Sequence, residues 1–165
     1  MDWSQIGSLD FRAVDEPTYF FNESMKLMGS LPRLKALRTE LPWFGETRDL
    51  QEFEDTFRRF LDVPRDAGLS EIALEGDYRP YLQAILDRHG GSLKKLQLHD
   101  PERPYEPQRE MLSEPELCDL GRRAPNLEAI SIDINYTPNG SLVGPFSRSP
   151  TAVACLSIYI SRNSQ

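Results

Sequence analysis

Apolar residues recur along the chain in a short, repeated spacing. In each of six segments an apolar residue is followed three and five positions later by two more, with one threonine as substitute: Ile6-Leu9-Phe11, Leu34-Leu37-Thr39, Leu69-Ile72-Leu74, Leu93-Leu96-Leu98, Leu127-Ile130-Ile132 and Val153-Leu156-Ile158. The first residues of these triplets lie 28, 35, 24, 34 and 26 positions apart. Such spacing suits one strand plus one helix per unit, so the pattern predicts a short buried strand at each triplet and a stacked repeat architecture.

Between the triplets the apolar spacing changes to the three- and four-residue intervals of an amphipathic helix. This spacing predicts helices from about residue 49 to 62, from 80 to 89, from 113 onward and from 17 to 28. Proline suits the first turn of the second and third helices, and Ser113 with Glu116 forms a capping box for the third. Gly90 and Gly91 are expected to give the second helix a left-handed exit, with His89 beside its last carbonyls.

The polar residues between the apolar positions indicate the kind of sheet. Lys95 to His99 and Ala129 to Asp133 alternate polar and apolar residues, which leaves one face of each strand in water. A doubly wound sheet, the alternative for this element order, is covered on both faces and has continuous apolar strands. We therefore expect one α/β domain over residues 1–165: a right-handed solenoid, or horseshoe, of about six irregular strand–helix units. Its parallel sheet would line the concave face and its helices the convex face.

Two proline-rich stretches interrupt the repeat. Residues 42–45 and 100–109 cannot continue a strand or a helix, because their prolines remove hydrogen-bond donors and restrict neighbouring residues, so both are expected to be insertion loops. The repeats begin almost at the first residue and stop soon after the sixth triplet. We therefore expect either a fragment of a longer array or an irregular cap formed by residues 136–150.

Composition and charge narrow the range of partners. The 165 residues carry a net charge of -7, without a cluster of Lys and Arg that could follow a phosphate backbone, so neither nucleic acid nor an anionic membrane is expected as a partner. No apolar run approaches the ~20 residues that span a bilayer. Cys118 and Cys155 lie far apart, which disfavours a disulfide framework or zinc site and favours a cytoplasmic or nuclear location.

The triplets, written L-x-x-L-x-L, resemble leucine-rich repeats, and two longer segments, residues 85–96 and 120–128, are similar to repeats of fungal F-box/leucine-rich-repeat proteins. The likeness covers nearly the whole chain, although an F-box is not recognisable in it. The family's Asn after the strand has a counterpart in Asn135, whereas Pro42 and Pro101 stand at that place in two other units. The resemblance implies a recognition domain that holds protein substrates for an SCF-type, cullin-based ubiquitin ligase.

The alternation along the strands also assigns side chains to the concave face, where a protein partner would bind. The candidate partner-binding residues on this face are Arg12, Arg38, Glu40, Glu71, Glu75, Lys95, Gln97, His99, Ser131, Asp133 and Tyr159. Aromatic residues in the expected loops after the strands are candidate anchors: Trp43, Phe44, Tyr78, Tyr105 and Tyr136. We expect a monomer that binds a protein partner through these residues.

Signs of catalysis are few. His99 and Asp100 form the one adjacent acid/base pair, and the sequence has no nucleophile motif, phosphate-binding loop or dinucleotide fingerprint. We therefore expect a non-enzymatic protein-interaction module with no catalytic residue, cofactor or metal site. One alternative is a stand-alone leucine-rich-repeat regulatory or scaffold protein without a ligase role. A remoter one is an α/β enzyme in which the triplets are coincidental.

Overall fold

The structure of the chain is a computed structural model that describes residues 5–12, 23, 26, 31–41, 47–62, 68–101, 111–136 and 152–159. For residues 47–50, 134–136 and 152–159 it describes the backbone alone. The elements follow one another as β1 (Ser8–Phe11), β2 (Ala36–Glu40), α2 (Thr47–Asp62), β3 (Glu71–Glu75), α3 (Arg79–His89), β4 (Lys95–His99), α4 (Glu114–Arg123), β5 (Ala129–Tyr136) and β6 (Ala152–Tyr159).

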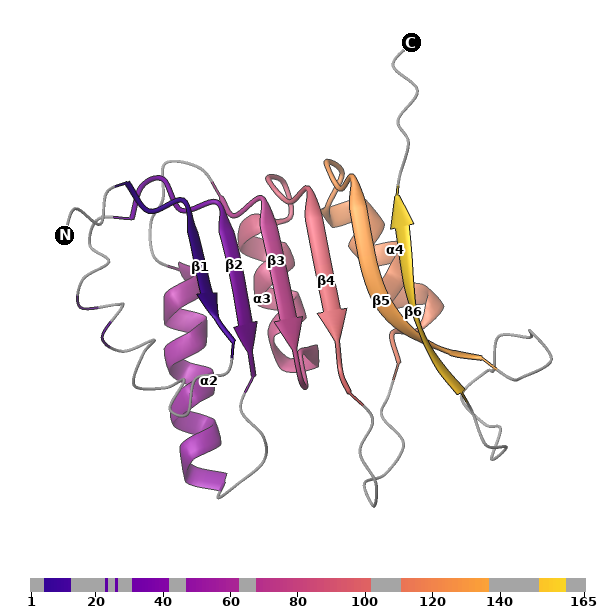
Figure 1. Ribbon diagram of the computed structural model, residues 1–165, viewed down its shortest axis with the longest axis horizontal. Coiled ribbons are helices and arrows are strands. Elements are labelled where there is room, and N and C mark those ends of the chain that lie inside the picture. The colour runs from indigo at the N-terminus through magenta and orange to yellow at the C-terminus, as the bar shows by residue number, and fades with distance from the viewer. Residues whose placement is uncertain are drawn as a thin grey trace, which may run out of the picture.

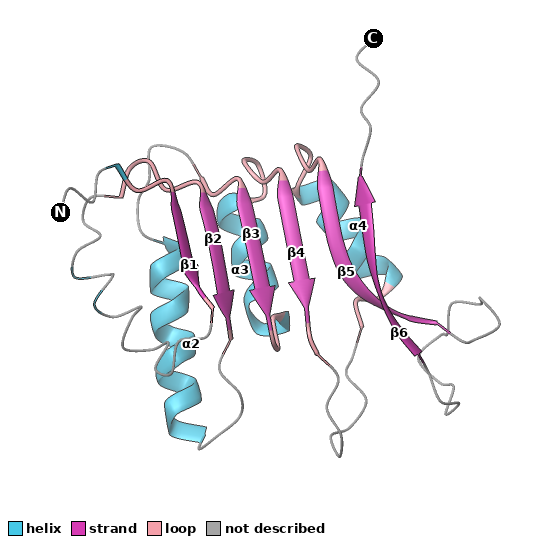
Figure 2. Cartoon of the chain, viewed as in Figure 1, coloured by secondary structure: helices cyan, strands magenta, loops and turns pink. Residues whose placement is uncertain are grey.

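The six strands form one sheet in the order of the sequence, from β1 to β6. Strands β1 to β5 are parallel to one another, and β6 runs antiparallel to β5. The helices α2, α3 and α4 all lie on one side of the sheet, so these helices leave its other side uncovered (Figure 1 and Figure 2). The chain is therefore an α/β fold in which a five-stranded parallel sheet alternates with helices.

The helices lie where the apolar spacing predicts them. Helix α2 starts two residues before the expected position and ends at Asp62, while α3 starts one residue early and ends at His89. Helix α4 follows its N-cap residue Ser113, and prolines occupy the first turns of α3 and α4, where a missing N–H removes no helical hydrogen bond. The expected helix over 17–28, but for residues 23 and 26, lies outside the described residues. So do the whole of the expected loop 42–45 and residues 102–109 of the second loop.

The strand register aligns the apolar triplets across the sheet. The second residue of each triplet lies beside the second residue of the next, in the order Leu9, Leu37, Ile72, Leu96 and Ile130. The third residues form a parallel row: Phe11, Thr39, Leu74, Leu98 and Ile132. Thr39, the one substitute, is also buried and donates its hydroxyl hydrogen to the carbonyl oxygen of Glu40 at 3.0 Å. In β1 to β5 the second and third residues of the predicted triplets are thus the rows of side chains that the sheet directs into the core.

A recurring pair of backbone hydrogen bonds connects the turns before the strands. The carbonyl oxygen of Lys35 accepts the N–H groups of both Ser70 and Glu71, at 2.8 and 3.0 Å. The same arrangement joins Gly7 to Lys35 and Ala36, Ser70 to Lys94 and Lys95, and Lys94 to Glu128 and Ala129. The units that contain β2 to β5 therefore begin with the same backbone geometry. In each of them the first residue of the triplet is buried and directly precedes the two residues whose N–H groups are bound.

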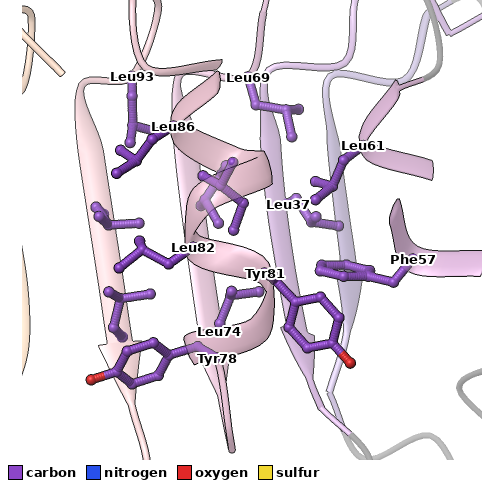
Figure 3. Close-up of a cluster of buried hydrophobic side chains, with 14 of the residues drawn as sticks. Leu37, Phe57, Leu61, Leu69, Leu74, Tyr78, Tyr81, Leu82, Leu86 and Leu93 are labelled. Atoms are coloured by element: carbon purple, nitrogen blue, oxygen red, sulfur yellow. The ribbon is translucent and has the colours of Figure 1, made fainter. Parts of the chain in front are cut away.

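Aromatic and leucine side chains fill the space between the sheet and the helices (Figure 3). Phe53 and Phe57 of α2 are fully buried, and their rings stack with centroids 5.7 Å apart. Tyr81 of α3 meets Phe57 edge-on, with ring centroids 4.9 Å apart, so this contact joins the two helices. The stripe of phenylalanines in the predicted helix is therefore the face of α2 that packs on the core.

The C-terminus of α3 differs from the expected left-handed exit. Gly90 has φ -49° and ψ -43°, in the right-handed helical region, whereas Gly76 is the described glycine with a positive φ, at +114°. Glycine is required at position 90 by a close approach, because a Cβ there would lie 2.4 Å from the carbonyl oxygen of Arg123. His89, expected beside the last carbonyls of its helix, is buried and accepts the N–H of Leu69 on Nδ1 at 3.3 Å.

The last strand contradicts the expected sixth parallel unit. Strand β6 pairs with β5 in antiparallel register, from Ala129 opposite Tyr159 to Tyr136 opposite Ala152. Alternating apolar and polar residues mark a strand but do not encode its direction, because parallel and antiparallel strands share the two-residue period. The sequence therefore located β6 correctly and assigned its direction wrongly.

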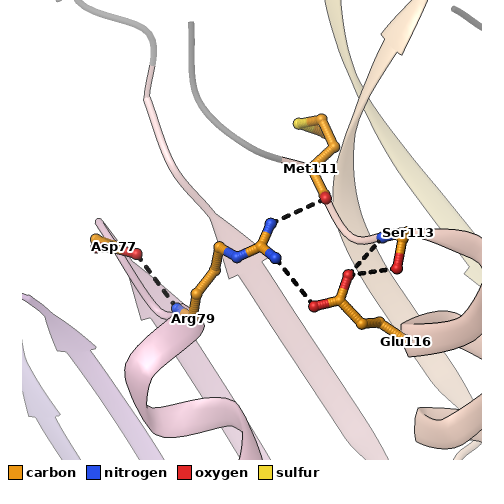
Figure 4. A network of polar contacts seen from close by, with 5 residues as sticks. All are labelled: Asp77, Arg79, Met111, Ser113 and Glu116. Atoms are coloured by element: carbon orange, nitrogen blue, oxygen red, sulfur yellow. Dashed lines mark hydrogen bonds and ion pairs between the residues drawn. The ribbon is translucent and has the colours of Figure 1, made fainter. Parts of the chain in front are cut away.

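One polar network joins the start of α3 to the start of α4 (Figure 4). Arg79 donates to the carbonyl oxygen of Met111 and to Oε1 of Glu116, both at 3.0 Å. The other oxygen of Glu116 accepts the hydroxyl hydrogen and the backbone N–H of Ser113, at 2.6 and 2.7 Å. These hydrogen bonds, aided by the charge of Arg79, hold the pKa of Glu116 below its usual value of 4.5. The predicted capping box is thus linked to the neighbouring unit.

We expect Glu116→Gln to destabilise the chain at neutral pH by about 0.5–1 kcal/mol, because the pair with Arg79 is half exposed and screened by solvent. A depressed pKa gives stability that is present above about pH 4.5 and is lost as the pH falls through the lowered folded-state value. Urea unfolding at a series of pH values should therefore show the free energies of unfolding of the wild type and Glu116→Gln becoming equal in acid. Glu114→Gln in the same helical turn is the control, and an equal pH dependence in both variants would contradict the assignment.

We expect Gly90→Ala to lower the free energy of unfolding by about 2 kcal/mol, because its Cβ would clash with a backbone oxygen that cannot easily move. The matched control is Gly91→Ala, since a Cβ at that position meets no atom within 4 Å. Thermal or urea unfolding of both variants measures the difference. Equal stability of the two variants would show that the approach of Arg123 to Gly90 is not close.

Candidate binding surface on the open face of the sheet

The side of the sheet opposite the helices carries the alternate strand positions, and we call it the open face. In β4 the side chains of Leu96 and Leu98 are buried, whereas Lys95, Gln97 and His99 are exposed. The same alternation in the neighbouring strands brings further predicted residues to this face. Together the described residues that were expected there and lie there are Arg38, Glu40, Glu71, Glu75, Lys95, Gln97, His99 and Ser131.

Some charges on the open face are matched within the chain. Lys95 Nζ lies 2.9 Å from Oε1 of Glu71 on the adjacent strand. Arg12, which follows β1 directly and is exposed, contacts both carboxylate oxygens of Asp10. The Arg12 hydrogen bond lowers the pKa of Asp10 and raises that of Arg12 itself. Arg38 is exposed and, within the described part of the chain, makes no side-chain hydrogen bond or ion pair.

His99 has a carboxylate partner, but a different one from its sequence neighbour. Its Nδ1 lies 2.9 and 3.1 Å from the two oxygens of Asp133, and Asp133 also accepts the backbone N–H of Asp100 at 2.7 Å. Because a carboxylate can only accept, Nδ1 of His99 carries the proton, and in the neutral ring Nε2 is the acceptor. His99 thus pairs with a carboxylate that lies 34 residues away in the sequence.

Two of the predicted site residues are buried and are corrections. Asp133 was expected on the exposed surface, but its side chain is 1% exposed because His99 and Asp100 enclose it with hydrogen bonds. Tyr78 was expected as a loop anchor, but it is 3% exposed at the N-cap of α3 and belongs to the core (Figure 3). Neither residue offers its side chain to a partner.

The other aromatic candidates are placed only in part. Trp43, Phe44 and Tyr105 lie outside the described residues. For Tyr136 and Tyr159 the backbone is described. Tyr136, expected in a loop after its strand, is instead the last residue of β5, whereas Tyr159 lies in β6, the strand in which it was expected. Tyr159 pairs with Ala129, an open-face position, as the alternation predicts.

The open face is hollowed around Ala73. Arg38, Ala73 and Gln97 are neighbours in the register of β2, β3 and β4, so one short side chain stands between two long ones. The hollow has a volume of about 340 Å³, and its lining residues are Leu37, Arg38, Glu71, Ile72, Ala73, Lys95, Leu96, Gln97, Ala129, Ile130 and Ser131. We call it the Ala73 hollow. Charged and polar side chains surround the short side chains of Ala73 and Ala129, an arrangement that suits recognition of a side chain from another molecule.

Ala73 and Ala129 were not among the predicted site residues, because long polar and aromatic side chains are the usual sign of a binding surface. Their signal was nonetheless in the sequence. In the strand register Ala73 stands between Arg38 and Gln97. Ala129 lies in the row of Glu71 and Lys95. A small residue at such a position predicts a depression, once the register of the neighbouring strands is known.

The described part of the chain lacks two kinds of feature, a metal-binding cluster and a membrane-spanning helix. No group of three or more His, Cys, Asp or Glu side chains among these residues could hold a metal ion. None of the described helices has both the length and the apolar character that a membrane span requires.

No protein-family model, curated protein or solved structure matches this chain. What the open face does is therefore inferred from its own residues.

We expect Asp133→Asn to cost about 1–3 kcal/mol of stability, because a neutral amide cannot replace the carboxylate for both His99 and Asp100. The neutral His99 ring should then lose its preference for the proton on Nδ1. Urea unfolding gives the first quantity, and nitrogen chemical shifts of the imidazole give the second. The control is Asp77→Asn, because the Asp77 side chain accepts a single long hydrogen bond, from the backbone N–H of Arg79 at 3.3 Å. An unchanged tautomer in Asp133→Asn would contradict the assigned pair.

Proposed function

We propose that the chain is a protein-interaction module of the leucine-rich-repeat type, with the open face as the concave surface of a right-handed solenoid and the helices on its convex side. Three observations support this architecture. The parallel strands follow the order of the sequence, their apolar positions align in register, and the same carbonyl arrangement recurs in the turns. Stacked strand–helix units of this kind bury a continuous core and leave one side of the sheet accessible.

The observation that carries the binding function is the polar character of the open face. Most parallel sheets are covered by helices on both faces and have apolar strands. Here Arg38, Lys95 and Gln97 are exposed along one face of a parallel sheet. Mixed charges and hydrogen-bonding groups fix the orientation of a protein partner, while the Ala73 hollow accepts a projecting side chain.

For the partner, we propose a protein substrate presented to an SCF-type ubiquitin ligase. The support is the resemblance of residues 85–96 and 120–128 to repeats of fungal F-box/leucine-rich-repeat proteins. The alternative is a stand-alone regulatory or scaffold protein that uses the same surface. Affinity purification of the product of the complete gene separates the two, because the ligase role requires a cullin adaptor among the recovered proteins.

The binding surface is tested by replacing Arg38, Lys95 and His99 together with alanine. Because a few central residues carry most of the energy of an interface, we expect recovery of the specific partner from lysate to fall about tenfold or more. The control replaces Arg58, Arg88 and Arg122, exposed cations on α2, α3 and α4, and should leave recovery unchanged. Circular dichroism and thermal unfolding establish that both variants are folded.

The reverse result would contradict the proposal. Loss of the partner in the helix variant, with retention in the open-face variant, would move the interface to the helical side. A folded wild-type chain that recovers no specific partner would count against both interaction hypotheses.

A further inference from the structure

We propose that the open face selects a partner segment with one acidic side chain, Asp or Glu, whose carboxylate enters the Ala73 hollow and is held by Arg38 and Gln97. This inference rests on the proposed binding function. It adds the chemical class of the group that the surface recognises.

The register creates a slot of suitable width. Arg38, Ala73 and Gln97 lie side by side on three adjacent strands. Neighbouring strands are about 4.8 Å apart, so the backbones of Arg38 and Gln97 are separated by about 10 Å. Ala73 fills only the base of this space with its methyl group. A carboxylate can therefore descend between the two long side chains and meet hydrogen-bond donors on both sides.

The donors on the two sides are not committed elsewhere. Arg38 and Gln97 are exposed, and within the described part of the chain neither side chain makes a hydrogen bond or ion pair. A guanidinium group presents paired N–H donors that match the two oxygens of a carboxylate, and the glutamine amide supplies a further donor. A neutral segment covering Arg38 would remove the water molecules bound to its guanidinium group and would supply no hydrogen-bond acceptor of opposite charge in their place. Such binding is unfavourable.

The surrounding charges restrict the occupant to a single acid. Glu71 at the rim is neutralised by Lys95, and Asp10, the carboxylate that faces Arg38 from β1, is held by Arg12. Farther along β3 Glu75 places another carboxylate on the open face, which would repel a second acidic group. The net charge of -7 likewise opposes an acid-rich partner. The preferred segment is therefore neutral or basic apart from one acidic residue.

The test uses the full chain and a phage library of random short peptides. Selection on the wild-type chain should enrich peptides with one Asp or Glu, and selection on Arg38→Gln should not. Arg88→Gln on α3 is the control, since Arg88 is an exposed arginine on the helical side. Thermal unfolding establishes that the variants are folded.

Binding of a selected peptide, measured by fluorescence anisotropy, identifies the contact. Arg38→Gln should weaken binding about tenfold or more, as should replacing the peptide's acidic residue with its amide. The two changes should not add when combined, because each removes the same interaction.

Three results would overturn the inference: enrichment of basic or uncharged peptides, acidic peptides whose binding is unaffected by Arg38→Gln, or no enrichment at all. None of them decides the proposed function. That is tested separately by recovery of a protein partner with the variant at Arg38, Lys95 and His99.

Discussion

The parallel part of the sheet depends on one backbone arrangement, a turn carbonyl that accepts two consecutive N–H groups from the next unit. Lys35, for example, holds both Ser70 and Glu71 in this way. A strand shifted by one residue would lose this geometry and would turn its apolar side chains, such as Ile72, onto the open face. The alignment of the core, the polar open face and the position of the Ala73 hollow all follow from this constraint.

Features that depend on local spacing could be predicted from the sequence. The apolar triplets located the strands, and the spacing of Phe53, Phe57 and Phe60 identified both α2 and the side that it buries. The start of α4 was predictable because the capping groups, Ser113 and Glu116, lie within one helical turn of each other. The same alternation placed most of the candidate binding residues on the open face.

Features that depend on contacts between distant residues could not be predicted in this way. Asp133 lies 34 residues from His99, and only the strand register brings the two together. Tyr78 is buried because it joins the core cluster that the sheet and helices form together, and the need for glycine at position 90 depends on the C-terminus of α4. The direction of β6 also depends on its neighbour rather than on its own residue pattern.

The antiparallel pairing of β6 determines where units could be added to this sheet during evolution. Strand β5 is bonded to β4 on one edge and to β6 on the other, so no further parallel strand can join it. Strand β1 has one neighbour among the described strands, β2. A duplicated strand–helix unit therefore fits the parallel pattern between β1 and β5, whereas the antiparallel β6 ends that pattern after β5.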